Sequence, residues 1–207
     1  APAKGYLACG DVGDGKMPDE QTLLDYIIRE IAFEKDMVGK KVLVTAGATR
    51  ESIDPVRFIT NHSSGKMGFA LAKAAMLRGA DVTVVAAHTD VAPPRFVEVI
   101  PVVSAADMFE AVTSRAGECD IIIKAAAVAD YRPKTVAAQK IKKSEGDMVL
   151  ELERNPDILA WLGEHKKHQI LMGFAAETND VREHALGKLA RKHLDFIAAN
   201  DVTMSHS

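Results

Sequence analysis

A short segment rich in small residues, "FITNHSSGKMG" at residues 58–68, precedes an apolar helical pattern and could contact a phosphate. A Walker loop requires Gly-x-x-x-x-Gly-Lys-Ser/Thr, so that backbone N–H groups surround the phosphates and a hydroxyl reaches magnesium. Here a methionine follows Gly65 and Lys66, and Thr60 takes the place of the first glycine. The dinucleotide fingerprint is also incomplete, since Gly65 and Gly68 lie far from the preceding apolar run. The segment therefore belongs to neither common class of phosphate loop.

The long connection between residues 47 and 65 carries many functional side chains. Loops of this length in compact domains are usually functional or disordered. The side chains include a carboxylate, a guanidinium, an amide and hydroxyls, on Asp54, Arg57, Asn61, His62, Ser63 and Ser64. We therefore expect this loop to contribute to a polar site.

A second group of candidates belongs to the apolar run "IIIKAAAVAD" at residues 121–130 and to the segment after it. The alanines would let a ligand approach the backbone near Ala126, and Asp130 stands where a magnesium ion or a ribose could be met. Three lysines follow, and their charge suits a polyphosphate: Lys140, Lys142 and Lys143.

Further candidates lie toward the end of the chain. Phe174 follows the run "ILMG" and could stack on a base, while Lys188 and Lys192 are four residues apart and share a helix face. Each feature has a plainer interpretation, since surface lysines are usually only solvated, Asp130 could cap a helix and Phe174 could be a core residue. Cys119 is interpreted as a small buried hydrophobe. The joint placement of the candidates at successive strand ends favours one shared site.

The composition narrows the class of protein. With 207 residues and 47% hydrophobic content, the chain can bury a substantial core. Its net charge of −3 argues against a general binder of nucleic acid or membrane surfaces and favours small anionic partners. The two cysteines lie far apart, and no apolar run is long enough for a membrane span. A cytoplasmic location is the simplest expectation.

Apolar runs alternate with amphipathic stretches along most of the chain. Residues 1–18 are rich in glycine and show no period, and a helix with an apolar stripe is expected from Pro18. Strands are expected at residues 40–47, 81–88, 96–103, 119–130, 170–177 and 196–200, and helices at 68–80, 105–117, 156–167 and 179–194. Ser104 is the expected N-cap of its helix. This alternation predicts an α/β fold of Rossmann-like, three-layer type, with a mostly parallel sheet and ligands beyond the carboxyl ends of its strands.

Five motifs together closely resemble phosphopantothenoylcysteine synthetase, the ligase family of coenzyme A synthesis. They are "DPVRFITNHSSGKMG", "KAAAVADYRP", "KIKK", "NPDI" and "GFAAET", and they run in family order from about Lys40 to Thr203. The leading "GYLACGDVGDGKMP" resembles the closing segment of phosphopantothenoylcysteine decarboxylase, a flavoprotein fused ahead of the synthetase in bifunctional bacterial members. The resemblance implies a mobile decarboxylase tail at residues 1–18, a linker helix at 19–39 and a synthetase domain at 40–207, apparently truncated at its C-terminus.

The resemblance also implies a reaction in two steps. The carboxylate of 4′-phosphopantothenate attacks the α-phosphate of CTP and releases pyrophosphate, and the amine of cysteine then displaces CMP from the acyl cytidylate. Magnesium would assist through the triphosphate near Asp130. FMN would be expected only in the decarboxylase domain, and a homodimer through the synthetase domain is expected.

The family's functional residues are carried over as expectations. Catalytic roles fall on Asn61 and Lys140, and Cys9 matches the proton-donating cysteine of the decarboxylase. The acyl substrate is expected at Asp54, Arg57, Asn61 and Ala127. The nucleotide is expected at Ser63, Gly65, Ala126, Asp130, Lys140, Pro156, Asp157, Ile158, Leu159, Phe174, Lys188 and Lys192, with a phosphate at the helix N-terminus from Ser63 to Gly65.

Two other functions remain open. A nicotinamide-dependent reductase would suit the fold, but no Gly-x-Gly-x-x-Gly follows the first strand, and the Tyr-x-x-x-Lys pattern of short-chain reductases fails because Thr135 takes the lysine's place after Tyr131. A non-catalytic nucleotide-binding module is the other alternative.

Overall fold

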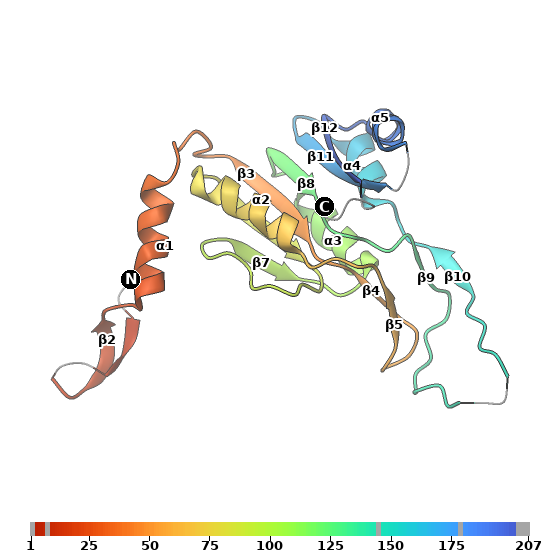
Figure 1. Ribbon diagram of the computed structural model, residues 1–207, viewed down its shortest axis with the longest axis horizontal. Helices are drawn as coiled ribbons and strands as arrows, with labels where there is room; N and C mark the ends of the chain where they lie inside the picture. Colours follow the sequence, from red (N-terminus) through yellow and green to blue (C-terminus); the bar gives the residue numbers. More distant parts are fainter. Residues whose placement is uncertain (1–2, 7–8, 144–145, 178–179, 202–207) are drawn as a thin grey trace.

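A parallel six-stranded sheet forms the centre of the computed structural model, which describes residues 3–6, 9–143, 146–177 and 180–201 (Figure 1). The strands lie in the order β12-β11-β8-β3-β6-β7, and all neighbouring pairs are parallel. Their bounds are β3 (Lys41–Ala46), β6 (Asp81–Ala86), β7 (Glu98–Pro101), β8 (Ile121–Lys124), β11 (Ile170–Glu177) and β12 (Phe196–Asp201). The predicted α/β fold with a mostly parallel sheet is confirmed.

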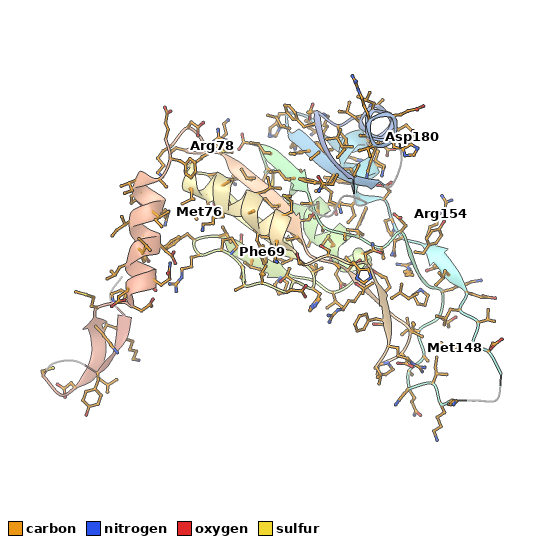
Figure 2. All side chains as sticks on the ribbon, in the orientation of Figure 1. Phe69, Met76, Arg78, Met148, Arg154 and Asp180 are labelled. Carbon is orange, nitrogen blue, oxygen red and sulfur yellow. The ribbon has the colours of Figure 1, made fainter. Side chains whose placement is uncertain are left out.

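Helices cover both faces of this sheet. On one face, α2 (Lys66–Leu77) directs Phe69 and Met76 into the core (Figure 2). On the other face, α3 (Ala105–Ala116) and α4 (Ile158–His165) contribute Met108 and Leu162 to a second core, and α5 (Val181–Arg191) adds Leu189. The three-layer architecture follows from the sequence, because strands buried on both faces read as continuous apolar runs.

Ser104 begins α3, as predicted. Its hydroxyl accepts a hydrogen bond from the Asp107 N–H at 3.1 Å, and the Asp107 carboxylate accepts one from the Ser104 N–H at 2.8 Å. This capping box is joined by the buried carboxylate of Glu51, which accepts from the Ala105 N–H at 2.9 Å. The start of α3 is therefore fixed to the loop that follows β3.

The strand order places a topological switch point beside β3. In order along the chain, β3, β6 and β7 extend the sheet in one direction, whereas β8, β11 and β12 extend it in the other. This is the arrangement of doubly wound dinucleotide-binding sheets, in which ligands occupy the crevice outside the carboxyl ends of the strands at the switch point. The loops after β3 and β8 meet there.

Three pairs of short strands were not predicted. β1 (Ala3–Tyr6) and β2 (Val12–Lys16) form a hairpin within the segment that was expected to lack regular structure. β4 (Arg50–Ser52) pairs with β5 (Phe58–Thr60), and β9 (Tyr131–Pro133) pairs with β10 (Leu152–Arg154). The latter two pairs form arms that extend from the same end of the sheet (Figure 1). Strands of three residues are too short to show an alternating apolar period.

The helix α1 (Glu20–Ile31) lies at the other end of the molecule, next to the β1–β2 hairpin (Figure 1). Tyr26 packs edge to face on Phe96 with ring centroids 4.7 Å apart, and Asp25 pairs with Arg95 at 3.0 Å. Two other residues of the predicted apolar stripe are exposed, Ile27 at 53% and Ile31 at 76%. Among the described residues, no helix is long and apolar enough to cross a membrane.

Candidate active site

The loops that follow β3 and β8 are hydrogen-bonded to each other at the switch point. The Ala127 N–H donates to the Gly47 carbonyl at 2.8 Å, and the Thr49 N–H donates to the Ala127 carbonyl at 3.2 Å. The Asn61 side-chain amide donates to the Val128 carbonyl at 3.3 Å. Predicted residues of the acyl-substrate group, Asn61 and Ala127, thus lie on loops that are joined to each other.

The alanine stretch that was expected to let a ligand approach the backbone near Ala126 has several of its N–H groups already bonded within the chain. In addition to Ala127, the Ala126 N–H donates to the hydroxyl of Thr45, and the Ala129 N–H donates to the hydroxyl of Thr49, both at 3.0 Å. Both threonines are fully buried. Any recognition of a base at these three alanines must therefore use carbonyl groups or neighbouring side chains.

The start of α2 shows a discontinuous form of the glycine fingerprint. Gly65 is the N-cap with φ of 76°, and a Cβ atom there would lie 2.4 Å from the Thr89 side chain and 3.4 Å from the Gly47 nitrogen. A Cβ atom on Gly68 would lie 2.7 Å from the Cβ atom of Ala46 in β3. These glycines therefore allow α2 to approach β3 closely, which is how glycines act in a dinucleotide fold. The sequence pattern is hidden because the β4–β5 arm is inserted after Gly47.

A cavity of about 340 Å³ lies at the carboxyl ends of β8 and β11. We call it the nucleotide pocket only because residues that were predicted to bind a nucleotide line it. It unites most of the predicted nucleotide residues, although they come from four separate segments of the chain. These residues are Ala126, Asp130, Pro156, Asp157, Ile158, Leu159, Phe174, Lys188 and Lys192. Sequence reasoning missed Lys124, Val128, Ala129, Tyr131, Arg154 and Asn155, which also line it. Arg154 stands at the base of the β9–β10 arm (Figure 2).

The charged side chains of the nucleotide pocket are partly paired. Lys192 forms an ion pair with Asp157 at 2.7 Å, and Lys188 donates to the Phe174 carbonyl at 2.8 Å. Asp157 also caps α4 by accepting from the Ala160 N–H at 2.9 Å. Burial raises the pKa of Asp157, but the bonds from Lys192 and Ala160 outweigh burial and hold it below its usual value. A charged carboxylate and two ammonium groups thus surround the cavity.

Lys124, the last residue of β8, is the most deeply buried cation of the pocket. It is 8% exposed, and burial lowers its pKa from 10.5 to about 7. Asp157 and Asp130 favour its charged form, whereas Lys188 and Lys192 oppose it. The sequence carried a signal, because a lysine inside the otherwise apolar run "IIIKAAAVAD" is costly unless it has a role.

We expect Lys124→Met to raise the melting temperature. The pKa of Lys124 is lower in the folded chain than in the unfolded chain, so the unfolded chain binds the Lys124 proton more tightly. Lys124 therefore destabilises the folded state fully below the folded pKa of about 7, and this destabilisation shrinks as pH rises toward the unfolded pKa of 10.5. The gain should therefore be several degrees at about pH 6 and smaller at about pH 9. Lys134→Met, at a side chain that is 62% exposed, is the matched control and should show no such trend in differential scanning fluorimetry. An equal gain for Lys124→Met at both pH values would contradict this account.

The second group of predicted residues surrounds another cavity, of about 980 Å³, between the β4–β5 arm and the segment after β9. Its lining includes Arg57 and the lysines of "KIKK", Lys140, Lys142 and Lys143. Lys140 therefore lines this cavity and is absent from the lining of the nucleotide pocket.

Asp54 and Arg57 connect the β4–β5 arm to the segment after β9 beside this second cavity. Asp54 is buried, accepts from the Arg57 Nε at 2.9 Å and from the Ile141 N–H at 3.1 Å, and Arg57 donates to the Ile141 carbonyl at 2.8 Å. The Arg57 guanidinium, although burial opposes it, keeps the pKa of Asp54 well below its usual range. In this arrangement Asp54 fixes the backbone next to Lys140, so its predicted contact with a substrate would be indirect.

The remaining predicted residues lie outside both cavities. Gly65, the N-cap of α2, has no side chain to cap the helix. The Gly65 N–H donates to the Ser63 hydroxyl at 3.4 Å, and the Lys66 N–H donates to the Ser64 hydroxyl at 3.4 Å. The helix N-terminus predicted there is confirmed, and its contact with a phosphate stays a prediction. Cys9 is exposed and lies between β1 and β2, whose hairpin is at the opposite end of the molecule from β9 and β10 (Figure 1).

Two predicted alternatives have clear outcomes. Cys119 is buried against the Arg115 carbonyl at 3.3 Å, and burial raises the pKa of its thiol, so its interpretation as a small buried residue is confirmed. Asp130 caps no helix and is an exposed residue of the pocket lining. In the described part of the chain, no three His, Cys, Asp or Glu side chains gather in a way that could hold a metal.

Comparison with known proteins gives matches over most of the chain. The family described as "DNA/pantothenate metabolism flavoprotein C-terminal domain" matches residues 37–207. The Coenzyme A biosynthesis bifunctional protein CoaBC of Bacillus subtilis (strain 168) is 53% identical over 204 residues, which are 97% of this chain and 50% of that protein. The CoaBC protein of Vibrio cholerae serotype O1 (strain ATCC 39315 / El Tor Inaba N16961) is 51% identical over 207 residues, 99% of this chain and 52% of that protein. The chain spans about half the length of these curated relatives.

Two crystal structures share the fold. One, of the C-terminal domain of Coenzyme A biosynthesis bifunctional protein CoaBC, aligns with a TM-score of 0.72 and 51% identity, covering 80% of this chain and 79% of that one. The other, the DNA/pantothenate metabolism flavoprotein from Streptococcus pneumoniae, has a TM-score of 0.73 and 25% identity, covering 82% and 86%.

Proposed function

Because the chain belongs to the family of the DNA/pantothenate metabolism flavoprotein C-terminal domain, we propose that it is a CTP-dependent ligase of coenzyme A biosynthesis that joins 4′-phosphopantothenate to cysteine. The names of its curated relatives support the pathway, and the bifunctional relatives are about twice as long as this chain. The decarboxylase activity and its FMN would belong to another domain, of which residues 1–18 would be the closing segment with Cys9.

The observation that carries this proposal is the composition of the nucleotide pocket. Residues of four segments, which include Asp130, Asp157, Phe174 and Lys192, line one cavity at the carboxyl ends of β8 and β11, on one side of the switch point of a doubly wound sheet. Such crevices are where α/β sheets bind nucleotides. The aromatic face, the capped start of α4 and the ammonium groups match the base, ribose and phosphates of a nucleotide.

The proposed first step forms an anhydride. A carboxylate oxygen of 4′-phosphopantothenate attacks the α-phosphorus of CTP, the bond to the bridging oxygen breaks, and pyrophosphate leaves with the electron pair. Negative charge grows on the leaving pyrophosphate, so a cation placed there lowers the barrier. Lys140 is the proposed residue for this role, with Lys142 and Lys143 beside it. Because these lysines line the second cavity, the proposal requires the triphosphate to extend out of the nucleotide pocket toward them.

The proposed metal fits the residues that are present. Mg²⁺ is usually held by one or two carboxylates together with substrate phosphates and water, so the single exposed carboxylate of Asp130 would suffice beside a triphosphate. When bound, the ion would neutralise phosphate charge. The chain itself supplies the carboxylate and the ammonium groups that position the triphosphate.

In the proposed second step, the amine of cysteine attacks the acyl carbon and CMP leaves, while the amine loses a proton. Asn61 is the proposed support for the oxyanion, because an amide can donate a hydrogen bond without adding negative charge. Arg57 and Ala127 are proposed neighbours of the acyl substrate. Arg57 is well placed for an anionic group because its guanidinium is fixed by Asp54.

A homodimer is proposed as the working assembly. Large apolar side chains are exposed along the two arms, among them Phe58 at 43%, Tyr131 at 47% and Val149 at 86%. Where such side chains come together in one contiguous patch, they mark interaction surfaces in soluble proteins. The arms lie next to the second cavity, so a partner subunit seated on them would stand close to Lys140.

One observation favours a second candidate function. The strand order is that of the dinucleotide-binding sheets of nicotinamide-dependent reductases. Gly47, Gly65 and Gly68 also lie where the glycines of the reductase fingerprint would lie, although here they are not contiguous in sequence. Calorimetric titration with CTP and with NADPH separates the two. Binding of CTP without pyrophosphate release in the presence of 4′-phosphopantothenate would instead indicate a non-catalytic module.

We expect pyrophosphate release to be faster with CTP than with ATP by at least about tenfold, because a pocket that hydrogen-bonds one base leaves polar groups unpaired with another. The backbone donors of Ala126, Ala127 and Ala129 are occupied, so side chains and carbonyl groups must supply this selectivity. A coupled pyrophosphate assay with both nucleotides at equal concentration measures the ratio. Equal rates would contradict base recognition in this pocket.

A further inference from the structure

Lys124 is a buried lysine with no direct counter-ion among the described residues. Its side chain lines the nucleotide pocket, yet within the described residues no hydrogen bond and no ion pair within 4.0 Å engages its ammonium group. The charged groups that act on it are Asp157 at the start of α4, Lys188 and Lys192 on and just after α5, and Asp130 after β8. A buried lysine normally requires a partner, because removing its charge from water is costly.

Several of the other donors nearby already make a contact within the chain. Lys192 is paired with Asp157, Lys188 donates to the Phe174 carbonyl, and the N–H groups of Ala126 and Ala129 are bound to buried threonines. The ammonium groups of Lys188 and Lys192 each have three donor positions, and the exposed side chains of Arg154 and Tyr131 also line the pocket. Lys124 differs from them because it is buried and has no partner among the described residues. Lys124 has three donor positions and a place in the pocket lining.

We propose that Lys124 donates a hydrogen bond to an oxygen atom of the nucleotide that occupies this pocket, and that this bond contributes to nucleotide affinity. The inference rests on the proposed function and deepens it. The acceptor is either a carbonyl oxygen of the base or an oxygen of the phosphates, which share the ability to accept from an ammonium group. The bound nucleotide thus supplies a partner that the described residues do not offer.

This contact would couple binding to a proton. Free Lys124 is largely neutral above its lowered pKa of about 7, and an acceptor oxygen, above all an anionic one, favours the ammonium form. Binding should therefore take up a proton at about pH 8, and much less at about pH 6, where Lys124 is already charged. Protonation changes of the nucleotide itself cancel when the wild type and a variant without Lys124 are compared.

Isothermal titration calorimetry of the whole chain with magnesium and CTP tests the proposal, in two buffers of different ionisation enthalpy at each pH. We expect Lys124→Met to weaken CTP binding about tenfold or more and to abolish the additional proton uptake at the higher pH. Since this variant should be more stable than the wild type, unfolding would not explain the loss. Lys134→Met, on an exposed lysine outside the pocket, should bind like the wild type.

Titrations with cytidine and CMP identify the acceptor. Weakening of cytidine binding by Lys124→Met indicates the base carbonyl, and weakening of only the phosphorylated ligands indicates phosphate; both support the proposal. Unchanged affinity and proton uptake for CTP in Lys124→Met would overturn it while leaving the ligase function intact. A wild-type chain that does not bind CTP would overturn the proposed function, and with it this inference.

Discussion

Lys140→Ala is expected to lower the rate of pyrophosphate release from CTP about 100-fold or more, because the leaving pyrophosphate loses a cation in the transition state. The structure supports a fixed position for this residue. Ile141, the next residue, is held at both its N–H and its carbonyl by Asp54 and Arg57. Stopped-time pyrophosphate assays with saturating 4′-phosphopantothenate measure the effect.

Two variants accompany Lys140→Ala. Lys140→Arg keeps the charge and should retain much more activity, whereas Lys134→Ala removes an exposed lysine whose partner, Glu151, is 3.7 Å away, and should leave the rate unchanged. If pyrophosphate release by Lys140→Ala equalled that of the wild type, the lysines of "KIKK" would be solvated surface residues and no part of the site.

Asn61→Asp should form the acyl cytidylate but discharge it about 100-fold more slowly, since a carboxylate beside the developing oxyanion repels its charge. The structure adds a reason for this effect. The Asn61 amide donates to the Val128 carbonyl at 3.3 Å, and a carboxylate at this position could not make that bond. Mass spectrometry of quenched mixtures, with and without cysteine, should show the mixed anhydride accumulating.

Asn61→Ala is the matched control for this variant, because it removes the amide without adding charge and should discharge the intermediate at a rate between those of the wild type and Asn61→Asp. Loss of both the intermediate and pyrophosphate release in Asn61→Asp would place Asn61 in the activation step. Normal ligation would show that the loop only shapes the site.

The central sheet was predictable because its strands are buried on both faces and are therefore continuous apolar runs in the sequence. Val42, Leu43 and Val44 are buried in β3 toward both faces, so their run of apolar residues identifies a central parallel strand without further information. The short arms were not predictable. The residues of β9, Tyr131 to Pro133, show no period, and their pairing with β10 depends on a partner some twenty residues later in the chain.

The site was predictable in its residue types more than in its geometry. Motif resemblance identified Asp157, Phe174 and Lys192, which the structure brings to one pocket. It could not indicate that Lys140 lines a different cavity, because that depends on how the arms fold. Lys124 was overlooked because no role was assigned to the lysine that opens the motif "KAAAVADYRP", although its burial is evident once β8 is central.

The most direct test of the proposed ligase is the formation of acyl cytidylate from CTP and 4′-phosphopantothenate without cysteine. We expect pyrophosphate release that requires 4′-phosphopantothenate, a mixed anhydride of matching mass in the quenched mixture, and its conversion to 4′-phosphopantothenoylcysteine and CMP when cysteine is added. Pyrophosphate release that does not depend on 4′-phosphopantothenate, or CTP binding with no anhydride under any of these conditions, would contradict the account.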